Sequence, residues 1–252
     1  MPNNIQLSKA VRSKLRRTFS ARMRKLALLV PGELIDLALN DHSPAQHRSE
    51  AIYLLGLLAG LNELPPDAAT IVRFLLKVMI ENKQRLISWS VATTLAQIGD
   101  RSALRGLSKI VTGDSNKETR RAAVYALGRL GDRRATPVLL RVFQSQKQST
   151  KLRAEAAEAL GICGCASKRA RAALADALED RSPRVAFFSA FAIGQCARAG
   201  FIISEDVTPK LQRLTRNRRV LVGIGSLGKE ATSALSAIRN VKRTQHPAVG
   251  KR

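Results

Sequence analysis

Aromatic residues are scarce in this sequence. Seven Phe, two Tyr and one Trp make up 4% of its 252 residues. Hydrophobic residues nevertheless reach 45%, which is enough to form a sizeable core in a chain of this length. The core must therefore consist mainly of Ala, Leu, Val and Ile. Ala and Leu are strong helix formers, so the composition favours an all-helical fold.

Acidic residues are also few. There are 19 Asp and Glu against 43 Lys and Arg, which gives a net charge of +24 and an isoelectric point near 11.3. Residues 1–32 contain no acid at all. A net charge of this size says nothing about the fold, but it indicates the kind of binding partner. The candidates are nucleic acid, an anionic membrane surface and an acidic protein. Because solubility alone needs far less charge, we favour a functional basic surface over a merely solvated one.

Cysteines and long apolar runs are limited as well. Three cysteines argue against a disulfide framework and for a reducing compartment, so we expect a cytoplasmic protein. No apolar run is long enough for a transmembrane helix. The apolar piece 26–30 is too short for a secretory signal. The acid-free start could mimic a transit peptide, but it leads directly into a helical pattern.

No residue set for catalysis or metal binding is visible. Cys163 and Cys165 form a close pair, but Cys163 and Cys196 share a core position of a repeat, and the histidines lie far away in sequence. Glu155 and Glu158 are better explained by surface pairing than by acid–base catalysis. A G-x-G-x-x-G match at 223–228 lacks the strand–helix context of a dinucleotide site. We therefore expect no metal, no cofactor and no enzymatic activity.

One short pattern recurs along the chain. An apolar residue followed by Gly or Ala repeats about every 32 residues, with a longer first interval. The pairs are Leu55-Gly56, Leu95-Ala96, Leu127-Gly128, Leu160-Gly161, Ile193-Gly194 and Ile224-Gly225. A period of this length is the mark of a solenoid. Gly in a helix interior costs about 1 kcal/mol relative to Ala, so we predict that each of these helices closely approaches a neighbouring helix.

Each unit contains two helical segments, for example 119–131 and 135–143. The pattern R-x-x-A-x-x-A-L-G-x-L-G-D-x-R-A-x-P-x-L, from Arg120 to Leu139, resembles the short HEAT-like repeat of the phycobilin-lyase type. The resemblance covers about 200 residues and implies an all-α fold, an α-solenoid superhelix of about six HEAT-like helix-pair repeats. It also implies a structural role for the recurrent Arg48, Arg120 and Arg153.

The same patterns divide the chain into three regions. We predict a basic N-terminal helical cap over 1–39, a repeat solenoid over 40–238 and a basic, disordered tail over 239–252. Apolar residues in 9–25 recur every three to four positions. They favour covering the first repeat, and peripheral contact with an anionic membrane is the less favoured alternative.

Two enzyme activities occur among similar repeat proteins. Phycobilin lyases act on bilins, and alkylation-repeat glycosylases use aromatic residues and a carboxylate. Trp89 is the only Trp, and no acidic residue lies within three positions of it. We therefore predict that Trp89 packs between repeats, and an enzyme is a distant third hypothesis.

Basic residues gather on the second helix of the units. The family resemblance implies that these helices line the concave face, where the residues would form a basic track. The polyanion-binding candidates are Lys77, Arg105, Lys109, Arg134, Arg141, Arg169, Arg171, Lys210, Arg213, Arg216, Arg218 and Arg219. We predict a non-catalytic scaffold that binds a polyanion, with nucleic acid first. The alternative is an adaptor that binds an acidic protein in the concave groove.

Overall fold

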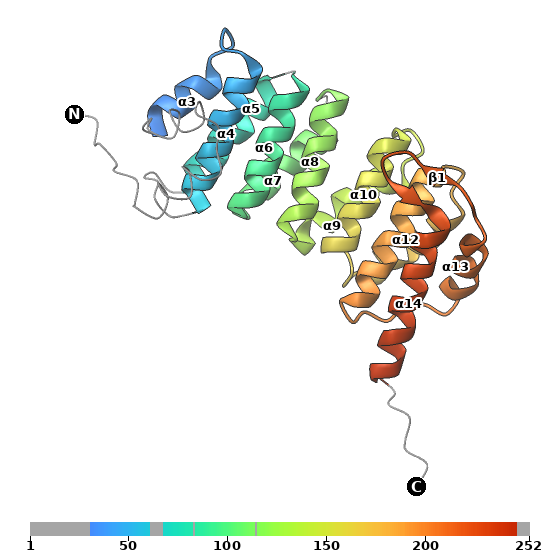
Figure 1. Cartoon of the computed structure of the whole chain (residues 1–252). Helices are drawn as coiled ribbons and strands as arrows, with labels where there is room; N and C mark the ends of the chain where they lie inside the picture. The colour runs from blue at the N-terminus through green and yellow to red at the C-terminus, as the bar shows by residue number, and fades with distance from the viewer. Residues whose placement is uncertain (1–30, 61–67, 83, 114, 246–252) are drawn as a thin grey trace, which may run out of the picture. The chain divides into compact units, whose positions relative to one another are not determined.

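The computed structural model describes residues 31–60, 68–82, 84–113 and 115–245. The chain divides into two compact units, residues 1–126 and 127–252. Helices dominate both units (Figure 1). The helices are α3 (Pro31–Leu39), α4 (Ala45–Gly60), α5 (Ala68–Glu81), α6 (Arg85–Ile98), α7 (Ala103–Thr112), α8 (Lys117–Leu130), α9 (Thr136–Gln144), α10 (Thr150–Cys163), α11 (Lys168–Asp176), α12 (Pro183–Arg198), α13 (Val207–Thr215) and α14 (Leu227–Gln245). Short 3₁₀ turns lie at Arg133–Ala135 and Ala177–Glu179, and two-residue strands β1 (Val220–Leu221) and β2 (Gly225–Ser226) pair antiparallel.

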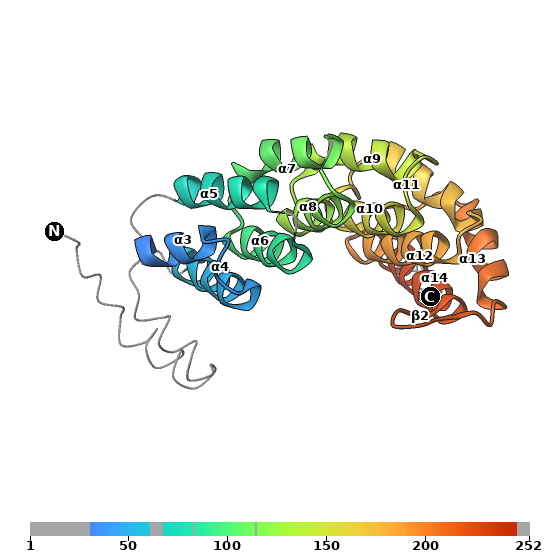
Figure 2. The same cartoon turned by 90° about the horizontal axis from the view of Figure 1, so that it is seen from above.

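The described helices follow one another as six pairs, so the predicted all-α solenoid of HEAT-like repeats is confirmed. Within each unit the even-numbered helices form one row and the odd-numbered helices another (Figure 2). The cores are aliphatic, as the composition predicts, with buried Leu, Ile, Val and Ala throughout. Helix α3 packs against α4 through the buried Leu34 and Ala38, and residues 1–30 of the predicted cap lie outside the described part.

The recurrent glycines mark close contacts between successive even-numbered helices, as predicted. A Cβ added to Gly161 would lie 2.7 Å from the Cα of Ala192, and one on Gly128 would lie 2.9 Å from the Cα of Ala159. In the first unit, Gly56 meets the side chain of Thr94 in the same way. Any larger residue would force these backbones apart.

The prediction that Ile224-Gly225 is the sixth pair of the series is wrong. Gly225 lies in strand β2, not inside a helix. Gly194 instead packs against Ala234 of α14, so the pair that continues the series is Leu235-Ser236, 42 residues beyond Ile193-Gly194. The additional length is a loop after α12 and the β1–β2 hairpin before α14. The insertion could not be recognised from the repeat spacing, because Ile224-Gly225 lies by chance 31 residues after Ile193-Gly194.

The curvature of the second unit also corrects an expectation. Helices α9, α11 and α13 lie on the outside of its bend, and α10, α12 and α14 lie inside (Figure 2). The resemblance had implied the opposite arrangement. The physical reason is the small residues of the even row, since contacts such as Gly161 on Ala192 let these helices approach closely. The odd-numbered helices are then spread apart, with open clefts between them.

The recurrent arginines have the predicted structural role. The Nε of Arg48 donates to the carbonyl of Ala38 at 2.9 Å, and the Nε of Arg153 donates to that of Phe143 at 3.0 Å. Arg120 makes the same bond in its repeat, to Val111 at 3.2 Å. Each arginine thereby binds a carbonyl at the end of the preceding odd-numbered helix, which would otherwise lack a partner.

The cysteines correct the expectation of no disulfide. Cys165 and Cys196 are bonded, with their Cα atoms 5.0 Å apart, and Cys163 is free and buried. Cys165 follows Gly164, the residue that ends α10, and reaches Cys196 of α12, whereas Cys163 is the last residue of α10 itself. The repeat period equates Cys163 with Cys196 and therefore missed this pairing.

The predicted tail begins too early. Helix α14 continues through Gln245, and only 246–252 lie outside the described residues. No residue before His246 interrupts the helical pattern, whereas Pro247 disfavours helix at the residue before it.

Candidate anion-binding site

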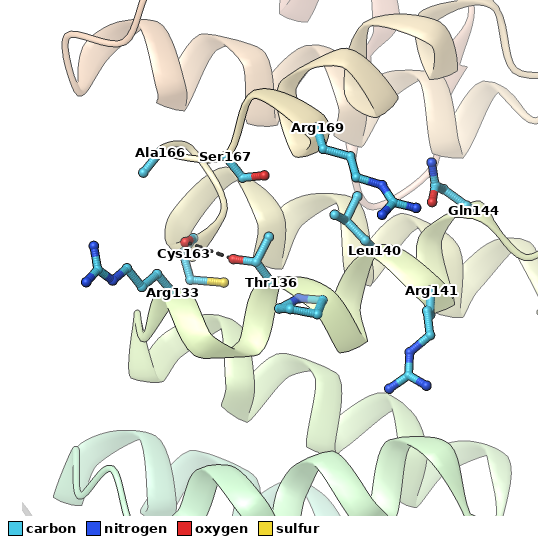
Figure 3. A pocket seen from close by; sticks show the side chains of 10 residues that line it. Arg133, Thr136, Leu140, Arg141, Gln144, Cys163, Ala166, Ser167 and Arg169 are labelled. Carbon is cyan, nitrogen blue, oxygen red and sulfur yellow. Dashed lines mark hydrogen bonds between the residues drawn. The ribbon is translucent and has the colours of Figure 1, made fainter.

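The outer row of the second unit contains an open cavity between α9 and α11, with a volume of about 670 Å³ (Figure 3). Its charged lining residues are three arginines: Arg133, Arg141 and Arg169. The polar residues Thr136, Gln144 and Ser167 and several apolar residues complete the lining, and no carboxylate takes part. The cavity is therefore electropositive.

Local structure positions each arginine. Asp132 caps the short 3₁₀ turn by accepting from the backbone N–H of Arg134 at 2.9 Å, which places Arg133 at one end of the cavity. Ser167 caps α11 by accepting from the N–H of Ala170 at 3.2 Å, so Arg169 lies in the first turn of that helix. These caps satisfy backbone donors that a helix start otherwise leaves open.

The three arginines differ in direction. Figure 3 shows Arg169 reaching toward Gln144 of α9, Arg133 at the opposite end and Arg141 turned away from Arg169. All three are exposed and none has an ion-pair partner among the described residues. A guanidinium with free donors can bind phosphate or carboxylate through two parallel hydrogen bonds.

The sequence prediction named Arg134 and missed Arg133. Arg134 is bound to Asp132, with Nη2 2.7 Å from Oδ2, and that carboxylate raises the pKa of its guanidinium. Arg133 next to it is unpaired and lines the cavity. The signal for this difference was present in the sequence, since an Asp two residues before an Arg readily accepts both its backbone and side-chain N–H groups.

Three other predicted residues of this unit are also occupied by partners. Lys210 is only 18% exposed and lies 3.7–3.9 Å from three carboxylates, those of Asp176, Glu179 and Asp206. Arg213 pairs with Glu179 at 2.5 Å. Arg171 donates to the carbonyl of Cys165 and lies over the ring of Phe201.

The remaining predicted residues are exposed. In the first unit, Arg105 and Lys109 lie on α7 without an ion-pair partner among the described residues, whereas Lys77 on α5 is 3.9 Å from Glu81. In the second unit, Arg216, Arg218 and Arg219 lie between α13 and β1 and are unpaired within the described part. Of the twelve candidates, the structure brings Arg141 and Arg169 together at this cavity. It brings Lys210, Arg213 and Arg219 together at a second cavity, which also contains the carboxylates of Glu179 and Asp180.

Trp89 is an inter-repeat packing residue, as predicted. Its ring lies 5.6 Å from that of Tyr125 on α8, and Arg121 stacks on it at 5.7 Å. A carboxylate that is distant in the sequence also lies beside Trp89. The indole N–H donates to Glu118 at 3.4 Å. Burial raises the pKa of Glu118, but hydrogen bonds from Arg121 and Trp89 outweigh it and hold the pKa below its usual value. This carboxylate therefore serves the packing cluster as an ion-pair partner.

The described residues offer no other group suited to catalysis or metal binding. Burial raises the pKa of the Cys163 thiol to about 11, so it is protonated and a poor nucleophile. Within the ranges that the structure describes, no three His, Cys, Asp or Glu side chains gather as metal ligands. In the same ranges, every helix is too short or too polar to cross a membrane.

Comparisons with known proteins agree with this architecture. Residues 72–150 match the model of HEAT repeats, and residues 152–180 match that of the PBS lyase HEAT-like repeat. The resemblance drawn from the sequence is thereby confirmed. No curated protein matches the chain significantly.

Among solved structures, a designed armadillo repeat protein in complex with the peptide (KR)4 is 16% identical, with a TM-score of 0.52 over 82% of this chain and 98% of that one. The designed armadillo repeat protein YIII(Dq)4CqI is 15% identical, with a TM-score of 0.51 over 83% and 100%. The CpcE–CpcF complex of phycocyanin lyase from Nostoc sp. PCC7120 is 14% identical, with a TM-score of 0.45 over 92% and 95%. The likeness to the two designed proteins concerns the fold alone.

Proposed function

We propose that this HEAT-like repeat protein is a non-catalytic scaffold that binds a polyanion, with nucleic acid as the first candidate. The observation that carries the proposal is the cavity between α9 and α11, lined by Arg133, Arg141 and Arg169 without a carboxylate. Unpaired guanidinium groups are available to phosphates, whereas cations that already have acidic partners are not.

The distribution of acids supports this choice of site. On α13, Lys210 and Arg213 face Asp176, Glu179 and Asp206, so much of that local charge is neutralised. No such acid lines the neighbouring cavity between α9 and α11. The cavity between α9 and α11 therefore attracts an anion more strongly than α13 does. This holds although basic residues are more densely clustered in the sequence around α13.

Nucleic acid is favoured because its phosphates are closely and regularly spaced. Each unit has exposed cations without an ion-pair partner among the described residues on its own odd-numbered helices, Arg105 and Lys109 on α7 in the first and Arg141 on α9 in the second. We expect binding that is governed by phosphates and independent of base sequence, since no base-reading motif is visible.

The absence of enzymatic activity is part of the proposal. It is supported by the lack of a nucleophile–base pair near the cavity, whose only thiol, Cys163, is buried and has a pKa of about 11. A cytoplasmic location rested on the number of cysteines, and the Cys165–Cys196 disulfide removes that support.

The second candidate function is a protein adaptor. The designed armadillo repeat protein of similar fold is in complex with a basic peptide, and this chain has the opposite charge preference. An acidic segment is therefore the matching partner. The inner row of the second unit, however, presents mixed charges, with Glu155 and Glu158 beside Arg129 and Arg184. This mixture favours the outer row as the polyanion surface.

The test is fluorescence anisotropy of a short labelled DNA duplex with the full chain across a salt series. Two double variants each remove two exposed positive charges from the second unit. Arg141→Gln/Arg169→Gln removes unpaired arginines at the cavity, and Arg134→Gln/Arg213→Gln removes arginines held by Asp132 and Glu179.

We expect the cavity variant to bind at least about tenfold more weakly and to lower the slope of log K against log salt by about two, one for each lost phosphate contact. The paired-arginine variant should change affinity less than about threefold. Equal losses in both variants would show a non-specific effect of net charge. Undiminished binding in the cavity variant would overturn the proposal, and competition by an acidic peptide alone would favour the adaptor.

A further inference from the structure

The β1–β2 hairpin is an element that the repeat architecture does not require. Val220 pairs with Ser226 and Leu221 with Gly225, and Gly223 at φ +71° forms the turn. The N–H of Ile224 closes this turn on the carbonyl of Leu221 at 2.9 Å. A left-handed residue at such a turn suits glycine, so the tip has a defined conformation.

The hairpin is anchored on the core of the second unit. Leu221 and Ile224 pack against the cluster formed by Ala186, Phe187 and Leu227. The N–H of Leu227 also donates to the carbonyl of Arg219 at 3.2 Å, joining the base of the hairpin to the start of α14. The tip is therefore held in place by buried contacts rather than left as a free loop.

The anchored hairpin presents two valines to solvent. Val220 is 71% exposed and Val222 is 97% exposed, and these are the most exposed large aliphatic residues of the described chain. Leu221 faces the core, while Val220 beside it in β1 and Val222 in the turn both face solvent. Most of the surface of both side chains is therefore in contact with water.

Cations surround this apolar tip. Arg216, Arg218 and Arg219 precede it, and Lys229 follows it in the first turn of α14. All four are exposed, and none has an ion-pair partner among the described residues. No acidic residue occurs in the sequence between Asp206 and Glu230. From elsewhere in the chain, Glu179 and Asp180 line a cavity with Arg219, but Arg181, Lys210 and Arg213 line it too, so the base of the hairpin keeps an excess of positive charge.

We infer that this hairpin docks the protein onto an anionic lipid bilayer. The valines would enter the boundary between headgroups and acyl chains, and the arginines would contact anionic headgroups. A nucleic acid would satisfy the arginines but leave Val222 in water, so a bilayer matches both features. In Figure 2 the hairpin lies beside α14, beyond the even-numbered row from α9 and α11, so this surface is separate from the proposed polyanion site. The contact is peripheral and independent of that function.

The first experiment is co-sedimentation of the full chain with phosphatidylcholine vesicles containing about 30% phosphatidylserine, compared with phosphatidylcholine alone. The test variant is Val222→Asp. The matched control is Ile202→Asp, which places the same charge at another aliphatic side chain, 70% exposed, in the loop after α12. Both sites lie at the surface, so neither change disturbs the core.

We expect the protein to bind the anionic vesicles and not the neutral ones. Val222→Asp should weaken binding at least about tenfold and Ile202→Asp less than about twofold, because only the first residue enters the interface. Equal binding by Val222→Asp and the unaltered chain would overturn the inference. A loss of duplex DNA binding in Val222→Asp, with vesicle binding unchanged, would assign the tip to nucleic acid instead.

A second readout does not depend on affinity. An environment-sensitive fluorophore on Val222→Cys should shift to the blue and gain intensity with anionic vesicles, whereas the same label on Ile202→Cys should not. The native cysteines do not interfere, since two form a disulfide and Cys163 is buried. An unchanged spectrum at position 222 on bound vesicles would also overturn the inference.

Discussion

Arg153 of α10 donates through Nη2 to Asp180 at 2.5 Å, while its Nε donates to the carbonyl of Phe143 at 3.0 Å. The side chains of Arg153 and Asp180 are 6% and 10% exposed. Asp180 in turn accepts from the N–H of Ser182 at 2.9 Å, just before α12. One buried arginine thus joins the end of α9, the start of α10 and the approach to α12.

Replacing Arg153 with Ala should destabilise the second unit by about 3–5 kcal/mol, because the change leaves the carboxylate of Asp180 without its buried partner. Urea unfolding followed by circular dichroism measures this loss. Arg141→Ala is the control and should change the free energy of unfolding by less than about 0.5 kcal/mol, since Arg141 is exposed and unpaired. Similar losses in both variants would contradict the structural role of Arg153.

Gly161→Ala should also destabilise the unit, by about 1–3 kcal/mol, although Ala is the better helix former. The new Cβ would lie 2.7 Å from the Cα of Ala192, and that backbone cannot move without separating α10 from α12. Gly194→Ala is the graded control, because its Cβ would lie 3.3 Å from the Cα of Ala234. The melting temperature of Gly161→Ala should be lower than that of Gly194→Ala, and the reverse order would contradict this packing.

Reduction of the Cys165–Cys196 disulfide should lower the stability of the second unit by about 3–4 kcal/mol, as expected for a bond that closes a loop of 31 residues. The measurement is the melting temperature with and without dithiothreitol. A Cys165→Ser/Cys196→Ser variant should melt at one temperature under both conditions. A reductant effect that persists in this variant would assign the sensitivity to another group.

Glu158→Gln should stabilise the protein at neutral pH. Burial and the neighbouring Glu155 raise the pKa of Glu158, and Arg129 and Arg184 only partly offset this. A carboxyl whose pKa is higher in the folded state contributes stability below its unfolded pKa and loses it as pH rises through the folded value. The variant's advantage in melting temperature at pH 7 should therefore shrink on acidification toward pH 4. An advantage that is the same at both pH values would indicate a cause other than ionisation.

The repeat and its close helix contacts were predictable because they depend on local periodicity. Gly128 and Gly161 stand at the predicted spacing and make the predicted contacts. The role of Arg153 could also be predicted, since the same arginine recurs at helix starts. These features repeat along the chain, and repetition is visible in one sequence.

Features that depend on a single tertiary contact could not be predicted. Lys210 meets Glu179, 31 residues earlier, and Trp89 meets Glu118, 29 residues later, so neither pairing has a local signal. The insertion before α14 places Gly225 at the expected repeat spacing by coincidence. The residue that Gly194 contacts is Ala234, further along the chain. Which cations remain unpaired, and so available to a polyanion, depends on such tertiary contacts and is not visible in the sequence period.

Hydrogen exchange of the full chain with and without a saturating DNA duplex tests the central claim most directly. If the unpaired arginines of the outer row bind the polyanion, the amides of 133–144 and 166–176 should become protected, while those of α13, where Lys210 and Arg213 already have acidic partners, should not change. Protection confined to α13 or to the inner helices α10 and α12, with none along α9 and α11, would contradict the account.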